Sequence, residues 1–330
     1  MKVYSKFFFK FRKLDVNLQT EQAKQVKIRT ILFLFHERNM GSAGFFLRQI
    51  AMRKAHSGHR FMCLLFFFFL LAGQQHLYSK QTDFKAFRNQ VKGSYNFWFF
   101  EPDDETDDPL GHHPLLIFLH GASLCGTNME KVKRYGPISA VAQGRYIDSY
   151  ILAPQNPGGP WKPEKIMKIV DWAIDHYAVD TTRIYVYGMS LGGYGTIDFA
   201  ATYPERVAAA MAICGGGTVK DLSGLTRVPL WIVHGTADRD VSVKESDRVV
   251  EAIRKAGDDS RLIYTRMQGV DHGQPGRIFY MFQTYDWLFS HSIKDPGREV
   301  CRDFEITPEL MKQAYSDLGR NANEYFNGYE

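Results

Sequence analysis

The sequence has few cysteines and no long apolar segment. Only four of its 330 residues are cysteine, and no Cys/His spacing resembles a metal-binding motif. The longest uninterrupted apolar run, Phe61 to Ala72, has 12 residues, whereas a membrane-spanning helix needs about 20. Internal repeats are also absent. The sequence therefore predicts neither a zinc module nor a repeat array, and we expect no metal or other cofactor.

The chain has no excess of positive charge once its N-terminal part is set aside. The formal net charge is +5, but residues 1–51 hold ten Lys and Arg against three Asp and Glu. The rest of the chain is then negative, with a net charge of −5 from residue 74 onward. A nucleic-acid-binding domain needs a basic surface to neutralise phosphates. We therefore expect no nucleic-acid partner.

The N-terminal residues look like targeting sequence. A basic stretch from Met52 to Arg60, the short apolar run and the small pair Ala72-Gly73 predict a secretory signal peptide at 52–73, with a membrane anchor as the alternative. Residues 1–51 have no clear hydrophobic period, so we interpret them as a leader or an over-extended start, with a targeting leader as the alternative. We expect a secreted or periplasmic protein without stable membrane insertion.

Residues 74–330 alternate predicted strands and helices and are long enough for one domain. Such alternation predicts an α/β fold with a mostly parallel central sheet and helices on both faces. A polar tail begins at about residue 294. The predicted strands are 91–100, 114–119, 150–154, 183–187, 207–213, 228–233 and 261–267, and the predicted helices are 165–177, 196–202 and 242–255.

The most informative motif is Gly-x-Ser-x-Gly at residues 188–192, between a predicted strand and a predicted helix. That context is typical of a nucleophile elbow, a sharp turn that exposes a serine above a sheet. The glycines allow the turn, so Ser190 is the candidate nucleophile. This interpretation requires an acid and then a histidine further along the chain.

Both partners follow later strands in that order. The apolar strand 228–233 runs into His234-Gly235-Thr236-Ala237-Asp238, and the strand 261–267 is followed by His272. Asp238 is our candidate for the acid. Asp240 is the alternative, because it lies two residues further along and only the folded geometry distinguishes the two carboxylates. His272 would take the serine proton during attack and return it to the leaving group, while the acid orients its ring.

A fourth element lies upstream, where the strand 114–119 runs into His120-Gly121-Ala122-Ser123. A turn of this kind supplies one backbone N–H to the oxyanion hole, and the residue after the nucleophile supplies another. We assign these donors to Ala122 and Leu191. His120 is expected to brace the turn.

Together these motifs resemble the α/β-hydrolase superfamily over roughly residues 90–292. Within it, the chain is similar to the polyhydroxybutyrate depolymerase and feruloyl esterase-like group, often labelled predicted peptidases. The resemblance implies a serine esterase that cleaves carboxylic esters, such as acyl groups on carbohydrates. Where related esterases often carry Gly-Glu-Arg-Gly after the His-Gly turn, this chain has Ser123-Leu124-Cys125-Gly126, so acyl preference does not carry over. The further segments that carry the resemblance are 180–190, 203–206 and 213–217.

Other functions remain open at this point. They are a serine peptidase or acyltransferase on the same fold, and a non-catalytic binding protein. Trp161 follows a predicted strand end and either stacks on a substrate or packs as a structural residue. Cys125 and Cys214 both follow strand ends, so a disulfide between them is one alternative.

Overall fold

The computed structural model describes residues 84–102, 108, 110–316 and 318. The predicted leader (1–51) and signal peptide (52–73) lie outside the described residues. All described residues belong to one compact unit that spans Gln75–Glu330. No helix among them has both the length and the apolar character needed to cross a membrane.

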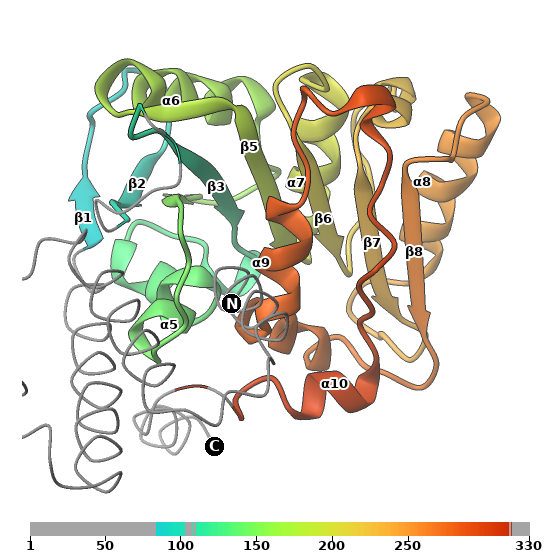
Figure 1. Ribbon diagram of the computed structural model, residues 1–330. Helices are drawn as coiled ribbons and strands as arrows, with labels where there is room; N and C mark the ends of the chain where they lie inside the picture. The colour runs from blue at the N-terminus through green and yellow to red at the C-terminus, as the bar shows by residue number, and fades with distance from the viewer. Residues whose placement is uncertain (1–83, 103–107, 109, 317, 319–330) are drawn as a thin grey trace, which may run out of the picture. The chain divides into compact units, whose positions relative to one another are not determined.

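The unit is built on one eight-stranded sheet with the order β1-β2-β4-β3-β5-β6-β7-β8 (Figure 1). β1 and β2 pair antiparallel to each other, and β2 pairs antiparallel to β4. From β4 to β8 every neighbouring pair is parallel. The strands are β1 (Phe84–Phe87), β2 (Asn96–Phe100), β3 (His113–Leu119), β4 (Tyr150–Gln155), β5 (Val179–Met189), β6 (Ala209–Ile213), β7 (Leu230–Gly235) and β8 (Leu262–Met267).

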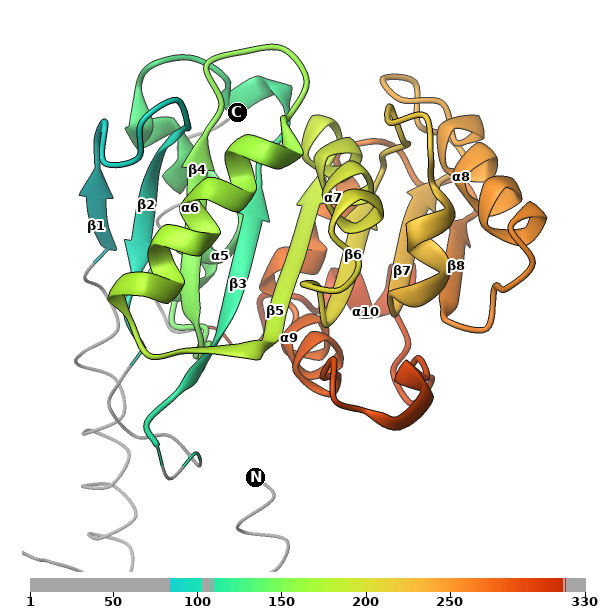
Figure 2. The same cartoon turned by 90° about the horizontal axis from the view of Figure 1, so that it is seen from above.

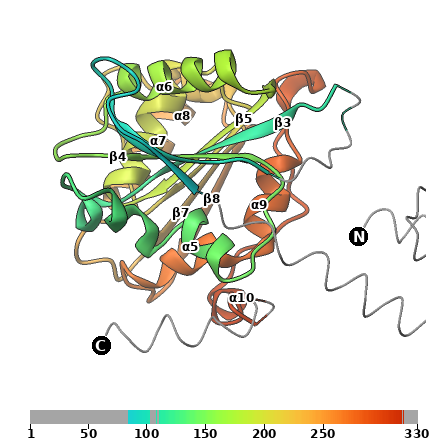
Figure 3. The same ribbon diagram turned by 90° about the vertical axis from the view of Figure 1, so that its left-hand side faces the viewer.

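Helices cover both faces of this sheet, as the alternation of elements predicts. One face carries α6 (Pro163–His176), α7 (Leu191–Thr202) and α8 (Lys244–Lys255), which lie side by side in Figure 2. The opposite face carries α5 (Pro137–Ala142), α9 (Phe282–Phe289) and α10 (Pro308–Lys312), as Figure 3 shows. The predicted fold class, the α/β-hydrolase fold with its mostly parallel sheet, is confirmed.

Strand β3 shows why the sheet has two apolar cores. All seven of its residues are buried. Because side chains alternate across a strand, Leu116 and Phe118 join the core beneath α9, while Leu115 and Ile117 join the core beneath α6 and α7. A strand buried on both faces reads as a continuous apolar run, which is how the sequence identifies it.

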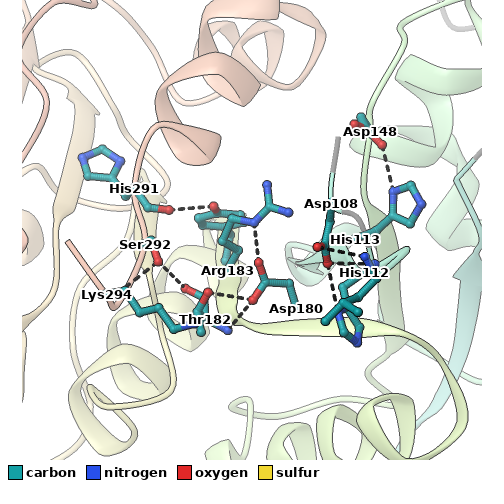
Figure 4. Close-up of polar contacts among 12 residues, drawn as sticks. Asp108, His112, His113, Asp148, Asp180, Thr182, Arg183, His291, Ser292 and Lys294 are labelled. Carbon is teal, nitrogen blue, oxygen red and sulfur yellow. Dashed lines mark hydrogen bonds and ion pairs between the residues drawn. The ribbon is translucent and has the colours of Figure 1, made fainter. Parts of the chain in front are cut away.

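Polar contacts at the amino ends of β3 and β5 hold the edge of the sheet that lies opposite the motifs (Figure 4). Arg183 Nε lies 2.6 Å from Asp180 Oδ2, and the Thr182 backbone N–H donates to Asp180 Oδ1 at 2.9 Å. His113 Nδ1 lies 3.0 Å from Asp148 Oδ1. The Asp-Thr-Thr-Arg segment, which carried part of the family resemblance, is therefore a structural feature at the start of β5.

The structure differs from the sequence prediction at both ends of the unit. β1 was not predicted, because four residues with no alternation of burial carry no strand signal. The tail from about residue 294 is not only polar. Ile306 and Met311 are each 2 % exposed and pack into the core that includes α9.

Candidate active site

Strand β5 delivers Ser190 to the carboxyl edge of the sheet. Ser190 has φ 59° and ψ −123°, a left-handed conformation that is uncommon for any residue except glycine. Its N–H donates to the Ile213 carbonyl at 2.9 Å, and α7 begins at the next residue. A strained serine between a strand and a helix is what a nucleophile elbow requires.

The elbow packs directly against the turn that follows β3. A methyl group on Gly192 would overlap the carbonyl oxygen of Leu119, so only glycine allows this close approach. On Gly121, a methyl carbon would lie 3.3 Å from Ser190 Cβ. The His-Gly turn and the candidate nucleophile are therefore neighbours in space.

Both predicted oxyanion donors occupy the first position of a helix. Ala122 begins the short 3-10 helix Ala122–Leu124, and Leu191 begins α7. The first N–H groups of a helix have no partner inside it, so these two are free of intrahelical bonds. Leu191 directly follows Ser190, and Ala122 directly follows Gly121, which packs against Ser190.

One buried and one partly buried side chain hold the turn that carries Ala122. His120 Nδ1–H donates to the Gly121 carbonyl at 2.8 Å, and its Nε2 accepts from the Asn156 N–H at 3.0 Å. Burial lowers the pKa of His120 to about 4, so its ring is neutral at pH 7. The Tyr135 hydroxyl accepts the Gly121 N–H at 2.6 Å. Burial raises the pKa of Tyr135 to about 12, so its hydroxyl stays protonated.

Asp238 and His272 meet at the same edge of the sheet. His272 Nδ1 lies 2.6 Å from Asp238 Oδ2, and the Asp238 side chain is fully buried. Asp238 Oδ1 accepts the backbone N–H groups of Asp240 at 3.0 Å and Val241 at 2.8 Å. Asp240 itself is exposed. Of the two carboxylates that the sequence left open, Asp238 has the hydrogen bond to His272.

The hydrogen bonds around Asp238 favour its charged form. Burial by itself raises the pKa of the carboxyl group, but the bonds from His272, Val241 N–H and Asp240 N–H outweigh it and hold this pKa below its usual value. An ionised carboxylate against Nδ1 fixes the tautomer of His272, which leaves Nε2 to accept a proton.

The loop that carries His272 reaches back to the elbow. A methyl group on Gly276, four residues after His272, would lie 3.6 Å from the sulfur of Met189, which precedes Ser190. β5, β6, β7 and β8 are also consecutive neighbours in the sheet. Their parallel carboxyl ends therefore present Ser190, Asp238 and His272 along one edge.

Two groups of side chains near this edge lie close enough to share a cation, within the part of the chain that the structure describes. One comprises Cys214, His234 and Asp238, and the other comprises Asp238, Asp240 and His272. In both groups a histidine nitrogen already pairs with the Asp238 carboxylate. We interpret both groups as one hydrogen-bonded network.

The structure does not support a substrate-binding role for Trp161. Its side chain is 2 % exposed, its indole N–H donates to the His120 carbonyl at 3.2 Å, and its ring packs edge-on against Tyr95. A buried ring offers no face to a sugar, so this geometry supports the structural role that the sequence left open. Cys125 and Cys214 are both free cysteines rather than a disulfide.

A cavity of about 480 Å³ lies between β8 and residues 304–308, lined by Trp231, Ile263 and Phe304 among others. Neither Ser190 nor His272 lines it. We place the reaction at the sheet edge rather than in this cavity, because the candidate nucleophile and base lie there.

No sequence motif points to Tyr135, His234 or Ser246. Tyr135 lies outside any recognisable motif, and its contact with Gly121 depends on how distant segments pack. His234 and Ser246 carry a visible signal only in hindsight. The histidine at the end of β7 is fully buried; it bonds Ser246 and the Val241 carbonyl and lies 3.2 Å from the Asp238 carboxylate.

Comparison with known proteins supports the resemblance. The prolyl oligopeptidase family matches residues 153–220, which include the elbow. Acetylxylan esterase A of Emericella nidulans is 39 % identical over 150 residues, which is 42 % of this chain and 46 % of that protein. Poly(3-hydroxyalkanoate) depolymerase C of Paucimonas lemoignei is 29 % identical over 121 residues, which is 31 % of this chain and 28 % of that protein.

Among solved structures, that of a thermostable esterase has a TM-score of 0.56 and 30 % sequence identity, covering 64 % of this chain and 63 % of that one. The chain spans less than half the length of the curated relatives named above. The resemblance to α/β-hydrolase serine esterases, first drawn from the motifs, is confirmed by these similarities.

Proposed function

We propose that this protein is a serine hydrolase of carboxylic esters, with Ser190, His272 and Asp238 as its catalytic triad. The observation that carries the proposal is the 2.6 Å contact between His272 Nδ1 and Asp238 Oδ2 at the sheet edge that also presents the strained Ser190. The similarity to esterases supports the same reaction class.

Acylation would begin when Ser190 Oγ attacks the carbonyl carbon of a bound ester and His272 Nε2 takes the serine proton. The carbonyl oxygen becomes an oxyanion, which the N–H groups of Ala122 and Leu191 stabilise. The tetrahedral intermediate collapses, the C–O bond to the alcohol breaks, and His272 gives its proton to the departing alcohol. Ser190 is left acylated.

Deacylation repeats the same chemical steps with water as the nucleophile. His272 removes a proton from water, the resulting hydroxide attacks the acyl carbon, and the same two N–H groups stabilise the second oxyanion. The bond to Ser190 Oγ then breaks, and His272 returns the proton to the serine. The products are one carboxylic acid and one alcohol, and the enzyme is regenerated.

For the substrate class we propose small acyl groups esterified to a carbohydrate. Acetylxylan esterases are among the relatives, and one of them is the source of the 39 % identity over 150 residues. The departure at residues 123–126 falls beside the oxyanion turn, so the acyl group itself has to be found by experiment.

Labelling with a fluorophosphonate probe tests the nucleophile. The wild-type protein should be modified at Ser190, and the Ser190→Ala variant should not react, because only an activated serine attacks the probe. Absence of labelling in a folded wild-type protein would contradict the proposal. Hydrolysis of acetyl, butyryl and feruloyl esters by the same samples then ranks the acyl groups.

A serine peptidase is the second candidate, because the prolyl oligopeptidase family matches residues 153–220. An N-acyl peptide in the same substrate panel distinguishes the two. Turnover of the peptide above that of every ester would favour the peptidase. An added alcohol acceptor tests acyl transfer, which would produce a new ester in place of the free acid.

We also propose that the enzyme is exported, on the basis of the basic stretch and apolar run at residues 52–73. Expression of the full chain and of a chain without residues 52–73, followed by cell fractionation, tests this. Esterase activity should appear outside the cytoplasm when the full chain is expressed, and should stay in the cytoplasm when residues 52–73 are removed. Equal distribution of the two would contradict export through this segment.

A further inference from the structure

The carboxylate oxygen of Asp238 that pairs with His272 also faces a second buried histidine. His234 lies next to the last residue of β7, is fully buried, and places Nε2 3.2 Å from Asp238 Oδ2. The same carboxylate oxygen lies 2.6 Å from His272 Nδ1. One oxygen atom of the proposed triad acid is therefore shared by two imidazole rings.

The neighbours of His234 fix the position of its proton. Nε2 lies 3.0 Å from the Val241 carbonyl as well as 3.2 Å from Asp238 Oδ2, and both of these oxygens can only accept. Nε2 therefore has to carry a hydrogen. Burial lowers the pKa of His234, which favours the neutral ring with this hydrogen on Nε2.

The other nitrogen of His234 is anchored to a different element. Nδ1 lies 2.7 Å from the hydroxyl oxygen of Ser246, a buried residue in the first turn of α8. That oxygen also lies 2.7 Å from the Gly215 carbonyl, which follows β6. The ring thus contacts Ser246 of α8 on one side, and on the other side its Nε2 faces the loop that carries the acid.

From this network we propose that His234 is a positioning residue, which holds the Asp238 carboxylate in place for His272 through its Nε2–H. The inference rests on the proposed function and deepens it, because it assigns a role to a side chain that touches no substrate. His234 also bonds the Val241 carbonyl, and Val241 N–H bonds Asp238. It therefore fixes both the acid and the loop that carries it.

Two amide variants separate the two ends of the ring. Asn at position 234 places a polar atom near the position of Nδ1 and keeps the contact with Ser246, but it is too short to reach Asp238. Gln places its amide nitrogen near the position of Nε2 and keeps the donor to Asp238. His234→Asn should lower kcat on an acetyl ester roughly 10- to 100-fold with KM within about twofold, since a misplaced catalytic group costs that much. His234→Gln should retain most of the wild-type kcat.

The dependence of kcat/KM on pH distinguishes a positioning role of His234 from a purely structural one, which would leave this dependence unchanged. The ionisable groups around His234 and His272 include Asp238, Asp240, Asp271, the thiol of Cys214 and the hydroxyl of Tyr194. Without the Nε2–H donor, more negative charge remains on Asp238 Oδ2 to favour the His272 imidazolium. The acidic limb of kcat/KM should therefore move to higher pH by about half a unit in His234→Asn and stay in place in His234→Gln.

Ser246→Ala is the matched control, because it removes the other hydrogen bond of the same ring but leaves the Nε2–H in place. It should keep the wild-type acidic limb and a kcat within about threefold. Equal losses in the Asn and Gln variants, with unshifted limbs, would overturn the proposal. If His234→Asn fails to fold, a shifted limb in Ser246→Ala or His234→Gln would overturn it, and wild-type limbs in both would support it. A wild-type protein that hydrolyses no ester would count against the proposed function instead.

Discussion

At the scale of single residues, the candidate site has two unusual features, the backbone conformation of Ser190 and the buried side chain of Asp238. Ser190 occupies a left-handed conformation with φ 59°, and Asp238 is a fully buried carboxylate that accepts three hydrogen bonds and lies 3.2 Å from His234 Nε2. Strain at Ser190 is tolerated because α7 and the end of β3 enclose the turn. The buried charge of Asp238 is tolerated because His272 and two backbone N–H groups donate hydrogen bonds to it.

Substitution of each carboxylate in turn tests the assignment of the acid. Asp238→Asn should lower kcat by roughly 10³- to 10⁴-fold, because an amide facing Nδ1 favours the wrong tautomer of the base. Asp240→Asn should cost less than about tenfold, because Asp240 bonds Asp238 through its backbone only. Steady-state kinetics on an acetyl ester measures both, with circular dichroism to verify folding. Mild and equal losses would contradict the assignment.

At the scale of elements, the ends of β3 and β4 are joined through one buried imidazole. His120 follows β3 and accepts a hydrogen bond from the N–H of Asn156, which follows β4. Protonation of Nε2 would break this bond. The oxyanion turn therefore depends on a histidine that has to remain neutral.

This dependence predicts how stability changes with pH. His120 binds a proton at about pH 6.5 in the unfolded chain but only at about 4 in the folded one, where burial lowers its pKa. Between these values the unfolded state holds more protons, so stability is full above about pH 6.5 and falls toward pH 4. The contribution of His120 to this loss is at most about 3 kcal/mol.

The His120→Gln variant is the comparison for this effect, because Gln cannot titrate but can still accept from Asn156 N–H. Urea unfolding at about pH 7 and about pH 4.5 measures the free energy of unfolding of both proteins. The wild type should lose more stability than His120→Gln across this interval. Parallel losses would show that other groups, such as the buried His234 and His291, carry the dependence.

At the scale of the whole described unit, the C-terminal segment forms part of the core. Cys301 N–H donates to His291 Nε2 at 2.9 Å, and its carbonyl accepts the indole N–H of Trp287 at 3.0 Å. Ile306 and Met311 then bury their side chains in the same apolar cluster as Trp287. This segment runs in front of β7 before it reaches α10 (Figure 1).

A charge placed in α10 measures this contribution. Met311→Asp should lower the free energy of unfolding by roughly 3–5 kcal/mol, because it leaves an unpaired charge in an apolar core. Lys312→Asp, at the next and exposed position, should change it by less than about 1 kcal/mol. Chemical denaturation measures both variants. Similar small effects would show that α10 adds little to stability.

Local sequence was sufficient to predict the central strands and the chemistry at their ends. The strands β3, β5 and β7 each contain a continuous apolar run, because the middle of a parallel strand is buried on both faces. The sequence also predicts that the residues at their carboxyl ends lie near one another, because parallel strands bring those ends to one edge of the sheet. In the structure, His272 bonds Asp238, and Ser190 lies next to the turn after β3.

Tertiary structure decided what no local pattern encodes. The preference for Asp238 over Asp240 as the partner of His272 follows from a turn that points one carboxylate inward and leaves the other exposed. The burial of Trp161 and the contact between His234 and Asp238 likewise arise from segments that meet only in the folded chain. Periodicity reports which face of an element is buried, whereas the direction of a side chain on a loop depends on distant neighbours. The sequence by itself thus determined the sheet and the order of its reactive residues, and packing decided which side chains pair.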